Sequence, residues 1–350
     1  MHVIEAKNVS DALAKGITHL LENGERENSR NGAVLVAPTP VVTVYTNPKR
    51  RVLQSATRDA NPFFHLMESL WMLAGRNDLK FPQQFNQRFG EYSDDGVVVH
   101  GAYGYRWRRH FGYDQLEWLI DELKSNPTSR RAVLAMWDGG STIPGEAYTM
   151  DGSLTPDIEA VEGSSDLYVA THGGKDVPCN THAYFDVRGG LLNMTVCCRS
   201  NDIIWGAYGA NAVHFSILQE YMAARVGVDT GVYRQVSNNF HAYTEVYNED
   251  RLKIIAQEAT SQAEWYPYSA PLVDAPMFFE ADLAAFMHDP TDMMVTYYNL
   301  FFMEVARPMF IAHKKHKEGD REGALISVDH IGAPDWRQAC HEWLQRRYTK

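Results

Sequence analysis

Cys179 is the residue whose position in the sequence best suits nucleophilic chemistry. It follows Pro178 and precedes a segment, residues 182–198, that alternates like a β-hairpin around a Gly-Gly pair at 189–190. Two adjacent glycines between strands are typical of a type I′ turn, because both positions need a positive φ. Cys179 therefore lies at a predicted loop–strand junction, where a side chain can face a cleft.

The predicted hairpin also supplies this cysteine with a charged neighbour. If the glycines form the turn, the numbers of paired residues keep a constant sum, which pairs Asn180 with Arg199 and Cys179 with Ser200. A guanidinium close to a thiol lowers the pKa of that thiol and favours the thiolate, the nucleophilic form. We therefore predict an ionised Cys179 beside Arg199.

The other thiols and the histidines indicate no second chemistry. Cys197 and Cys198 lie in the middle of the second hairpin strand, where small buried hydrophobic residues are expected. The cysteines form no C-x-x-C pair, and His313 and His316 flank two lysines that would repel a cation. We expect the histidine pair to lie on a solvated helix face, and we expect no metal site.

Composition narrows the partners and the compartment. The chain has 350 residues, with 33 Lys or Arg and 44 Asp or Glu, so its formal net charge is −11. An acidic surface repels polymeric nucleic acid, so an anionic ligand needs a local basic cluster. The N-terminus has no signal-peptide core, and no apolar run has membrane-spanning length. We predict a cytoplasmic protein with reduced thiols and no membrane partner.

Hydrophobic periodicity predicts the elements that must position these residues. Apolar residues recur at helical spacing in some segments and at strand spacing in others. We predict helices over 9–23, 62–74, 113–125 and 211–225, and strands over 33–46, 132–137 and the hairpin 182–198. Helices and strands interspersed in this way indicate an α/β class of fold.

Three segments do not follow these patterns. Residues 25–32 are predicted to be a polar loop, and residues 139–177, rich in Gly, Ser, Thr, Asp and Glu, a long surface insertion. From about residue 280 the pattern is helical again. We therefore predict a catalytic domain over 1–279, which includes the insertion, and a helical C-terminal extension over 280–350.

Several motifs, taken together and in order, resemble those of the thymidylate synthase family. They are Ser29-Arg30-Asn31-Gly32, Glu68-Ser69-Leu70-Trp71, Tyr103-Gly104 with Trp107-Arg108, Ser129-Arg130-Arg131, Pro178-Cys179-Asn180, Arg199-Ser200-Asn201-Asp202, Asn211 at a helix start, and His241-Ala242-Tyr243. The resemblance covers about residues 10–275. It implies a thymidylate synthase-like fold, in which helices pack a large mixed sheet and one sheet face forms a homodimer interface.

The resemblance also implies a reaction at a pyrimidine ring. Cys179, as thiolate, would add to C6 and make C5 an enolate carbon, which attacks the one-carbon unit of 5,10-methylenetetrahydrofolate. Glu68 would be the general acid and base, although by pattern alone it is an ordinary helix-surface glutamate. Tyr103 would assist removal of the C5 proton, and Asn180 stands where the family has a histidine.

The implied substrate is a pyrimidine nucleoside monophosphate whose phosphate is held by basic residues. Arg30, Arg199 and Ser200 would bind it within one subunit. In the family the paired arginines, here Arg130 and Arg131, come from the partner subunit, which implies a homodimer with shared active sites. By pattern alone, the same pair also fits a solvated turn.

The base, sugar and folate would each meet a polar side chain. Asn211 would read the base, since a side-chain amide can accept from N3–H and donate to O4 of uracil. Relatives that act on cytosine nucleotides have Asp there, so Asn211 favours dUMP. His241 and Tyr243 would bind the ribose 3′-hydroxyl, unless they are a core pair, and Asp202 would contact the pterin. Segment 206–211 is one residue longer than in typical synthases, which predicts a different loop shape.

Departures from the family pattern bear on the product. Phe89 and Tyr92 replace two tryptophans expected near the folate, Cys198 replaces a glutamine, and the short apolar C-terminal tail is absent. Such changes admit water to the exocyclic carbon, where a synthase delivers hydride. They resemble the longer phage-type deoxyuridylate and deoxycytidylate hydroxymethylases, so 5-hydroxymethyl-dUMP is the expected product. A thymidylate synthase, a dCMP or CMP hydroxymethylase and an inactive nucleotide-binding homologue stay open as alternatives.

Overall fold

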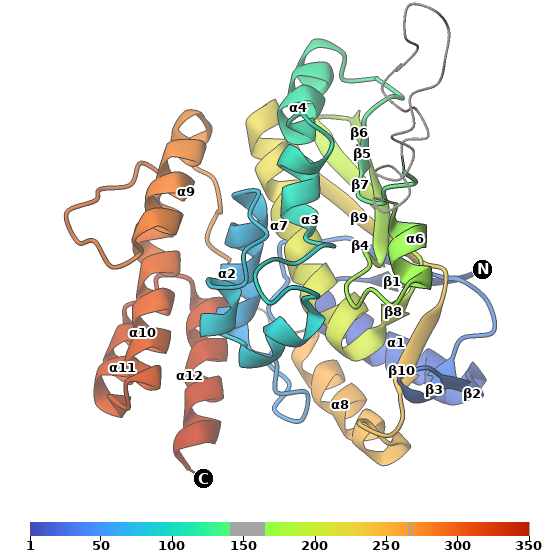
Figure 1. Cartoon of the computed structure of the whole chain (residues 1–350). Coiled ribbons are helices and arrows are strands. Elements are labelled where there is room, and N and C mark those ends of the chain that lie inside the picture. Colours follow the sequence, from blue (N-terminus) through green and yellow to red (C-terminus); the bar gives the residue numbers. More distant parts are fainter. Residues whose placement is uncertain (141–164, 265–266, 268, 350) are drawn as a thin grey trace, which may run out of the picture.

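A six-stranded mixed sheet packed by helices forms the centre of the protein, as expected. The computed structural model describes residues 1–140, 165–264, 267 and 269–349 (Figure 1). The strand order is β1 (His2–Ala6), β4 (Val41–Tyr45), β9 (Asp229–Ser237), β7 (Leu191–Cys198), β6 (Asn180–Arg188) and β5 (Val133–Ala135). The pairs β1–β4 and β7–β9 are parallel and the others antiparallel.

β6 and β7 form the predicted hairpin. Gly189 and Gly190 have φ angles of 58° and 76°, as a type I′ turn requires, and Arg188 pairs with Leu191. The turn prediction is confirmed.

The register of this hairpin changes close to the cysteine. The turn's register holds as far as His182 and then shifts, so that Asn180 pairs with Cys198. The N–H of Arg199 donates to the carbonyl of Cys179 at 2.8 Å. The predicted partners of Asn180 and Cys179 are therefore wrong by one residue, because a β-bulge inserts an extra residue into β6. The bulge sets Arg199 opposite the cysteine.

A smaller sheet brings distant segments of the chain together. Its strand order is β2 (Glu25–Ser29), β3 (Gly32–Val36), β10 (Phe240–Tyr243) and β8 (Asn201–Asp202). The prediction of a polar loop over 25–32 is wrong, because residues 25–29 pair with β3 as an exposed edge strand. Arg30 lies in the β2–β3 turn, and Asp202 pairs with His241 across β8 and β10.

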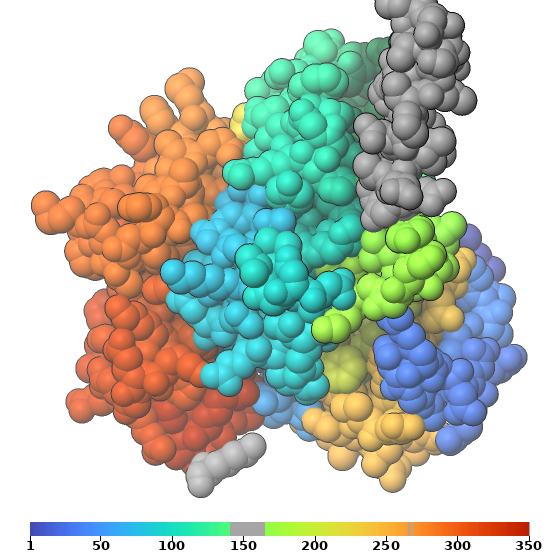
Figure 2. Space-filling view, in the orientation of Figure 1, coloured from blue at the N-terminus to red at the C-terminus, as the bar shows by residue number. Residues whose placement is uncertain are grey.

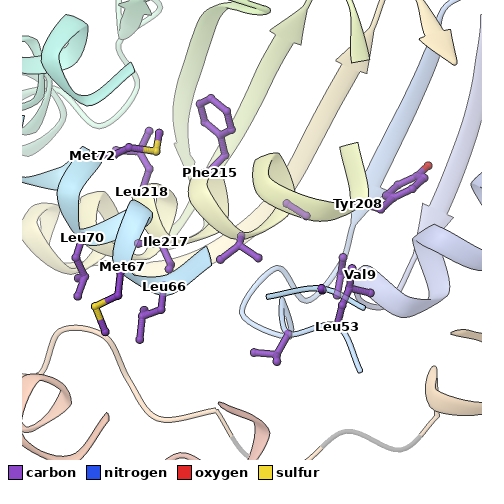
Figure 3. Packing of buried hydrophobic residues seen from close by; sticks show 14 of the residues in the cluster. Val9, Leu53, Leu66, Met67, Leu70, Met72, Tyr208, Phe215, Ile217 and Leu218 are labelled. Atoms are coloured by element: carbon purple, nitrogen blue, oxygen red, sulfur yellow. The ribbon is translucent and has the colours of Figure 1, made fainter. Parts of the chain in front are cut away.

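Two packed helices carry residues of the candidate site. α2 (Pro62–Leu73) and α7 (Asn211–Val226) confirm the predicted helices. Figure 3 shows Leu66 and Leu70 of α2 beside Ile217 and Leu218 of α7, within one buried hydrophobic cluster. This packing places Glu68 next to the first turns of α7.

The remaining helices and turns surround these elements. They are α1 (Val9–Asn23), α3 (Tyr103–Tyr105), α4 (Gln115–Ser125), α6 (Asp166–Thr171) and α8 (Glu249–Gln262), with 3₁₀ turns at Pro82–Gln84, Gln87–Tyr92 and Pro276–Phe278 and π-helical turns at Arg106–His110, Ile203–Ala210 and Phe302–Ala306. The turn before α7 is kinked at Gly209, within the segment predicted to differ in shape. Among the described residues, no helix is both long enough and apolar enough to cross a membrane.

The predicted C-terminal helices gather on one side of the molecule, orange to red in Figures 1 and 2. They are α9 (Phe279–His288), α10 (Arg307–Lys317), α11 (Arg321–Asp329) and α12 (Pro334–Tyr348). Trp343 of α12 meets Phe63 of α2 edge-on at 5.4 Å, and Arg346 and Arg347 each bind Asp59 at 3.0 Å. The extension therefore packs on the helix that carries Glu68. The domain boundary at residue 279 stays a prediction.

The prediction of a solvated histidine pair is wrong for His313. Its side chain is 3% exposed and packs against Phe63 and Phe85, and burial lowers its pKa to about 3. His316 is only half-buried and lies within hydrogen-bonding distance, 3.1 Å, of the Tyr348 hydroxyl. The sequence showed the adjacent lysines but not the aromatic side chains that the fold brings to His313.

Most of the predicted insertion, residues 141–164, lies outside the described residues. Its C-terminal end is held firmly, because the fully buried Asp166 accepts two hydrogen bonds from Arg106, at 2.7 and 2.8 Å, and one from the N–H of Asp138. Residues 165–177 are mostly exposed or half-buried, as expected for a surface insertion, and this anchoring ties them to the rest of the fold. They form part of the body that surrounds Cys179.

Candidate active site

A cavity of 540 Å³ opens between the small sheet and the segment before β6. Seven of the predicted site residues line it: Arg30, Tyr92, Cys179, Arg199, Ser200, His241 and Tyr243. Further lining residues are Glu27, Ser29, Asn31, Val34, Val36, Ala170, Lys175, Asp176, Val177 and Asn239. The fold thus collects one nucleophile and two arginines, from three separate parts of the sequence, around one space.

The backbone around Cys179 is held from both sides. The hydroxyl oxygen of Tyr103 accepts from the N–H groups of Cys179 and Asn180, at 3.1 and 3.0 Å. On the other side, the carbonyl of Cys179 accepts from the N–H of Arg199. These three bonds fix the backbone at Cys179, and they give Tyr103 a positioning role in the ligand-free chain.

Arg199 binds the loop that precedes the cysteine. Its Nε donates to the carbonyl of Pro178 at 2.8 Å, and its Nη2 donates to that of Val177 at 3.0 Å. The guanidinium also lies 5.7 Å from the centre of the Trp137 ring. The predicted neighbouring cation is present, although a bulge rather than the simple register brings it there.

The predicted ionised thiol is wrong for the ligand-free chain. Burial raises the pKa of Cys179 above its usual value. Arg199 and Arg30 pull this pKa down, Asp176 pushes it up, and burial outweighs both arginines. The sequence revealed the cation but neither the desolvation nor the second charge. In the ligand-free protein, the Cys179 thiol is therefore largely protonated at neutral pH.

Asp176 is a cavity residue that the sequence analysis missed. Its Oδ2 accepts from the N–H of Gly101 at 2.6 Å, and burial raises its pKa. Its place three residues before Cys179 was a usable signal, obscured because residues 139–177 were all assigned to a surface insertion. The cavity thus holds a carboxyl group as well as arginines.

A chain of buried amides lies behind the cysteine. Asn180 donates from Nδ2 to Oδ1 of Asn211 at 3.0 Å, and Asn211 donates to Oδ1 of Asn201 at 3.0 Å. All three side chains are at most 7% exposed, and Oδ1 of Asn180 has no partner. Each amide oxygen can accept twice and each amide nitrogen can donate twice, so Asn211 retains capacity for a base.

His241 and Asp202 face each other from neighbouring strands. Burial lowers the pKa of His241 and raises that of Asp202, while their mutual attraction opposes both shifts. Oδ1 of Asp202 accepts from the N–H groups of Ile204 and Trp205, at 2.9 and 2.6 Å, and its Oδ2 is buried without a partner. Asn239 lies 2.7 Å from Nδ1 of His241. An unpartnered buried carboxylate oxygen suits a ligand that carries N–H donors.

Glu68 does not line the cavity and is paired with a residue that the motifs did not include. Its Oε2 is 3.1 Å from Nε2 of His214, with side chains 12% and 4% exposed. His214 follows Asn211 by one helical turn, so the i, i+3 spacing was a signal that could have been read.

Eight of the predicted site residues do not line this cavity: Glu68, Phe89, Tyr103, Arg130, Arg131, Asn180, Asp202 and Asn211. Arg130 and Arg131 are exposed, and Arg131 contacts Glu122 at 3.3 Å. Phe89 is buried in the core, with its ring edge-on to those of Phe64 and Trp71. Tyr92 lines the cavity and stands in front of Phe89 at 6.4 Å between ring centres. Within the described part of the chain, no group of three His, Cys, Asp or Glu could hold a metal ion.

Comparison with known proteins gives a consistent set of relatives. The family model described as thymidylate synthase matches residues 12–264. The deoxyuridylate hydroxymethyltransferase of Pseudomonas phage M6 is 45% identical over 361 aligned residues, which cover 99% of this chain and 95% of that protein. The enzyme of the same name from Bacillus phage SP01 is 35% identical over 59% of this chain and 50% of its own length. A putative thymidylate synthase of Methanosarcina acetivorans is 26% identical over 69% of this chain and 89% of its own length.

Proposed function

Because this chain belongs to the thymidylate synthase family, we propose that it transfers a one-carbon unit to C5 of dUMP and releases it as 5-hydroxymethyl-dUMP. One observation carries the choice of product. The 45% identity to the deoxyuridylate hydroxymethyltransferase of phage M6 runs through the C-terminal extension as well as the catalytic part. The residues around the cavity support the same chemistry.

Cys179 starts the reaction by forming a bond from its sulfur to C6 of the ring. The electron pair of the C5–C6 double bond moves toward the O4 carbonyl, and C5 becomes nucleophilic. The proton of the thiol must leave first, so the raised pKa of Cys179 makes its deprotonation part of catalysis. Arg199, opposite the cysteine, stabilises the sulfur anion as it forms.

Charged and polar residues hold the nucleotide over this sulfur. Arg30, Arg199 and Ser200 bind the phosphate, and His241 with Tyr243 binds the sugar hydroxyl. Asn211 reads the uracil edge with the amide capacity left free by its two neighbours. Together these contacts keep C6 within reach of the sulfur.

The one-carbon donor is proposed to be 5,10-methylenetetrahydrofolate, which supplies the carbon at the formaldehyde level of oxidation. The buried, unpartnered Oδ2 of Asp202 fits the N–H groups of a pterin. Tyr92, 56% exposed at the cavity wall, offers a ring for a flat ligand. Phe89 supports Tyr92 from behind.

A product analysis tests this proposal. The full chain is incubated with dUMP and methylenetetrahydrofolate, and both products are identified by mass. We expect 5-hydroxymethyl-dUMP and tetrahydrofolate. Formation of dTMP and dihydrofolate would instead establish a synthase, turnover of dCMP or CMP alone would establish a cytidylate enzyme, and tight nucleotide binding without turnover would establish an inactive homologue.

We also propose a homodimer that shares its active sites. The face of the large sheet turned away from the helices carries Val42, Val44, Thr195, Cys197 and Val236, all half-buried. Arg130 and Arg131 are exposed and lie outside the cavity of their own chain, as residues given to a partner would. The dimer would work in the cytoplasm, which is that of an infected host if the chain is phage-encoded like the hydroxymethyltransferases of phages M6 and SP01.

Subunit mixing tests the sharing of sites. Cys179→Ala and Arg131→Ala proteins are each expected to have little activity alone, and mixed dimers regain activity because one of their two sites has both residues. Sedimentation analysis reports the oligomeric state directly. A monomer with full turnover would overturn this part of the proposal.

A further inference from the structure

We propose that His214 is a positioning residue for Glu68, and that the two side chains act as one unit that takes the proton from the water added in the last step. The inference rests on the proposed hydroxymethylation. It assigns a function to a histidine that none of the motifs above includes.

The geometry singles out this pair from the rest of the core. Nε2 of His214 lies 3.1 Å from Oε2 of Glu68, yet neither atom has a well-aligned hydrogen bond in the ligand-free chain. The two side chains come from different helices, α7 and α2, whose apolar faces are locked together. A buried histidine next to a buried carboxylate needs only a small rotation to make a strong, charge-assisted hydrogen bond.

The position of His214 links it to the substrate. Asn211, the proposed reader of the base, opens α7, and His214 lies one turn further along the same helix. Glu68 is close enough to Tyr92 of the cavity wall to influence the titration of that phenol. The pair is therefore linked to Asn211 through α7 and to Tyr92 of the cavity wall through the charge of Glu68.

The other titratable groups near the pair come from α2 and from the loop before it. His65, one turn before Glu68, is buried, and burial together with nearby Arg58 and His214 lowers its pKa well below the usual value. Neutral His65 cannot neutralise Glu68, and Arg58 donates from Nε to the carbonyl of Ile204. These contacts leave His214 as the histidine whose ring nitrogen faces Glu68, at 3.1 Å.

The final step needs such a base. After the one-carbon unit is attached, C5 carries an exocyclic methylene while Cys179 is still bound at C6. The oxygen of water bonds to the methylene carbon, and the double-bond electrons move to the ring carbonyl as an enolate. The water proton passes to Glu68, with His214 aligning and sharing the charge. The enolate then re-forms the C5–C6 double bond, the C6–sulfur bond breaks, and Cys179 regains a proton.

The test separates this step from those before it. Release of tritium from [5-³H]dUMP reports attachment of the carbon, whereas hydroxymethyl product reports hydration. Added 2-mercaptoethanol competes with water for the exocyclic methylene and yields a thioether. In His214→Gln we expect tritium release close to the wild-type rate, a fall of about tenfold to a hundredfold in hydroxymethyl product, and a raised thioether fraction. The pH profile of product formation should change shape.

Two further variants make the result decisive. His313→Gln removes an equally buried histidine from the extension and should leave product ratio and pH profile unchanged. In a Glu68→Gln background, His214→Gln should add no further loss if it acts through Glu68. If His214→Gln does not fold, His214→Asn is used in both comparisons. An unchanged product ratio and pH profile, or full additivity with Glu68→Gln, overturns the inference, whereas wild-type protein that makes no hydroxymethyl-dUMP overturns the proposed function instead.

Discussion

The catalytic part and the C-terminal extension both bury carboxylates, but these carboxylates differ in how completely they are hydrogen-bonded. In the extension, Asp282 accepts hydrogen bonds from the backbone N–H and the side-chain Nδ2 of Asn299, both at 2.7 Å. It also accepts from the backbone N–H of Tyr298 at 3.1 Å. In the catalytic part, Glu68 and Asp202 each keep one buried oxygen without a hydrogen-bond partner, although that of Glu68 lies 3.1 Å from Nε2 of His214. An unsatisfied buried carboxylate oxygen costs free energy, and at these two positions a ligand or a reacting proton would complete the hydrogen bonding. The contrast separates residues that stabilise from residues that react.

Two thiols, the half-buried Cys179 and the buried Cys340, provide the largest test of this contrast. Cys179→Ala should reduce turnover by about 10⁴-fold or more, because no other group can bond to C6, and should leave the free energy of unfolding nearly unchanged. Cys340→Ala, at a fully buried thiol of α12, should do the reverse, with a loss of about 1 kcal/mol in stability and normal turnover. Steady-state kinetics and urea unfolding on both variants measure this. Substantial turnover by Cys179→Ala would contradict the mechanism.

Glu68→Gln should lower kcat by about 10²-fold to 10⁴-fold, as expected for loss of a general acid and base. The amide keeps the size of the side chain, so dUMP affinity and the unfolding midpoint should stay close to the wild-type values. Calorimetric titration with dUMP is the control for binding. A change in dUMP affinity with unchanged kcat would give Glu68 a binding role instead.

Asp282→Asn tests whether a buried carboxylate of the extension contributes to stability and not to turnover. An amide supplies only one acceptor oxygen to the three N–H donors around Asp282, so at least one buried donor loses its partner. We expect a loss of about 1 to 3 kcal/mol in the free energy of unfolding and unchanged kcat per folded molecule. If kcat fell while stability held, the extension would have a direct part in catalysis.

The smallest expected effect concerns the charge beside the thiol. Burial has already raised the pKa of Cys179, and Arg199 opposes that rise. Arg199→Gln should therefore raise the pKa further and slow alkylation of Cys179 by iodoacetamide at pH 7.5 by about threefold to tenfold. In all forms the rate should increase with pH as the thiolate fraction grows, and Arg199→Lys should stay near wild type. Alkylation at Cys179 is followed by peptide mass. A faster reaction in Arg199→Gln would contradict the claim that Arg199 lowers the pKa of Cys179.

The turns, the helix starts and the order of the motifs could be predicted from the sequence, because each depends on residues that are close together in the chain. Gly189-Gly190 specifies its turn through backbone sterics, and Asn61-Pro62 specifies the start of α2 through capping. The sequence therefore predicted the hairpin, the main helices and seven of the residues that line the cavity.

What failed depended on residues far apart in the chain. The bulge near Asn180 lies in the pairing of β6 with β7, two strands that the chain brings together. The protonated state of Cys179 depends on its burial by several elements at once. The i, i+3 spacing places His214 on the same helix face as Asn211, but local patterns do not show that Glu68 of α2 lies opposite it or that His313 is buried. These features arise only from contacts between helices and strands that are distant in the sequence.

The sequence by itself determined which reactive groups this protein has, because residue type and short-range spacing define a nucleophile, a cluster of arginines and a base-reading amide. Only the tertiary structure decided their protonation and their partners. Proton affinity in a folded protein is set by desolvation and by charges a few ångströms away, and both depend on how distant segments pack together.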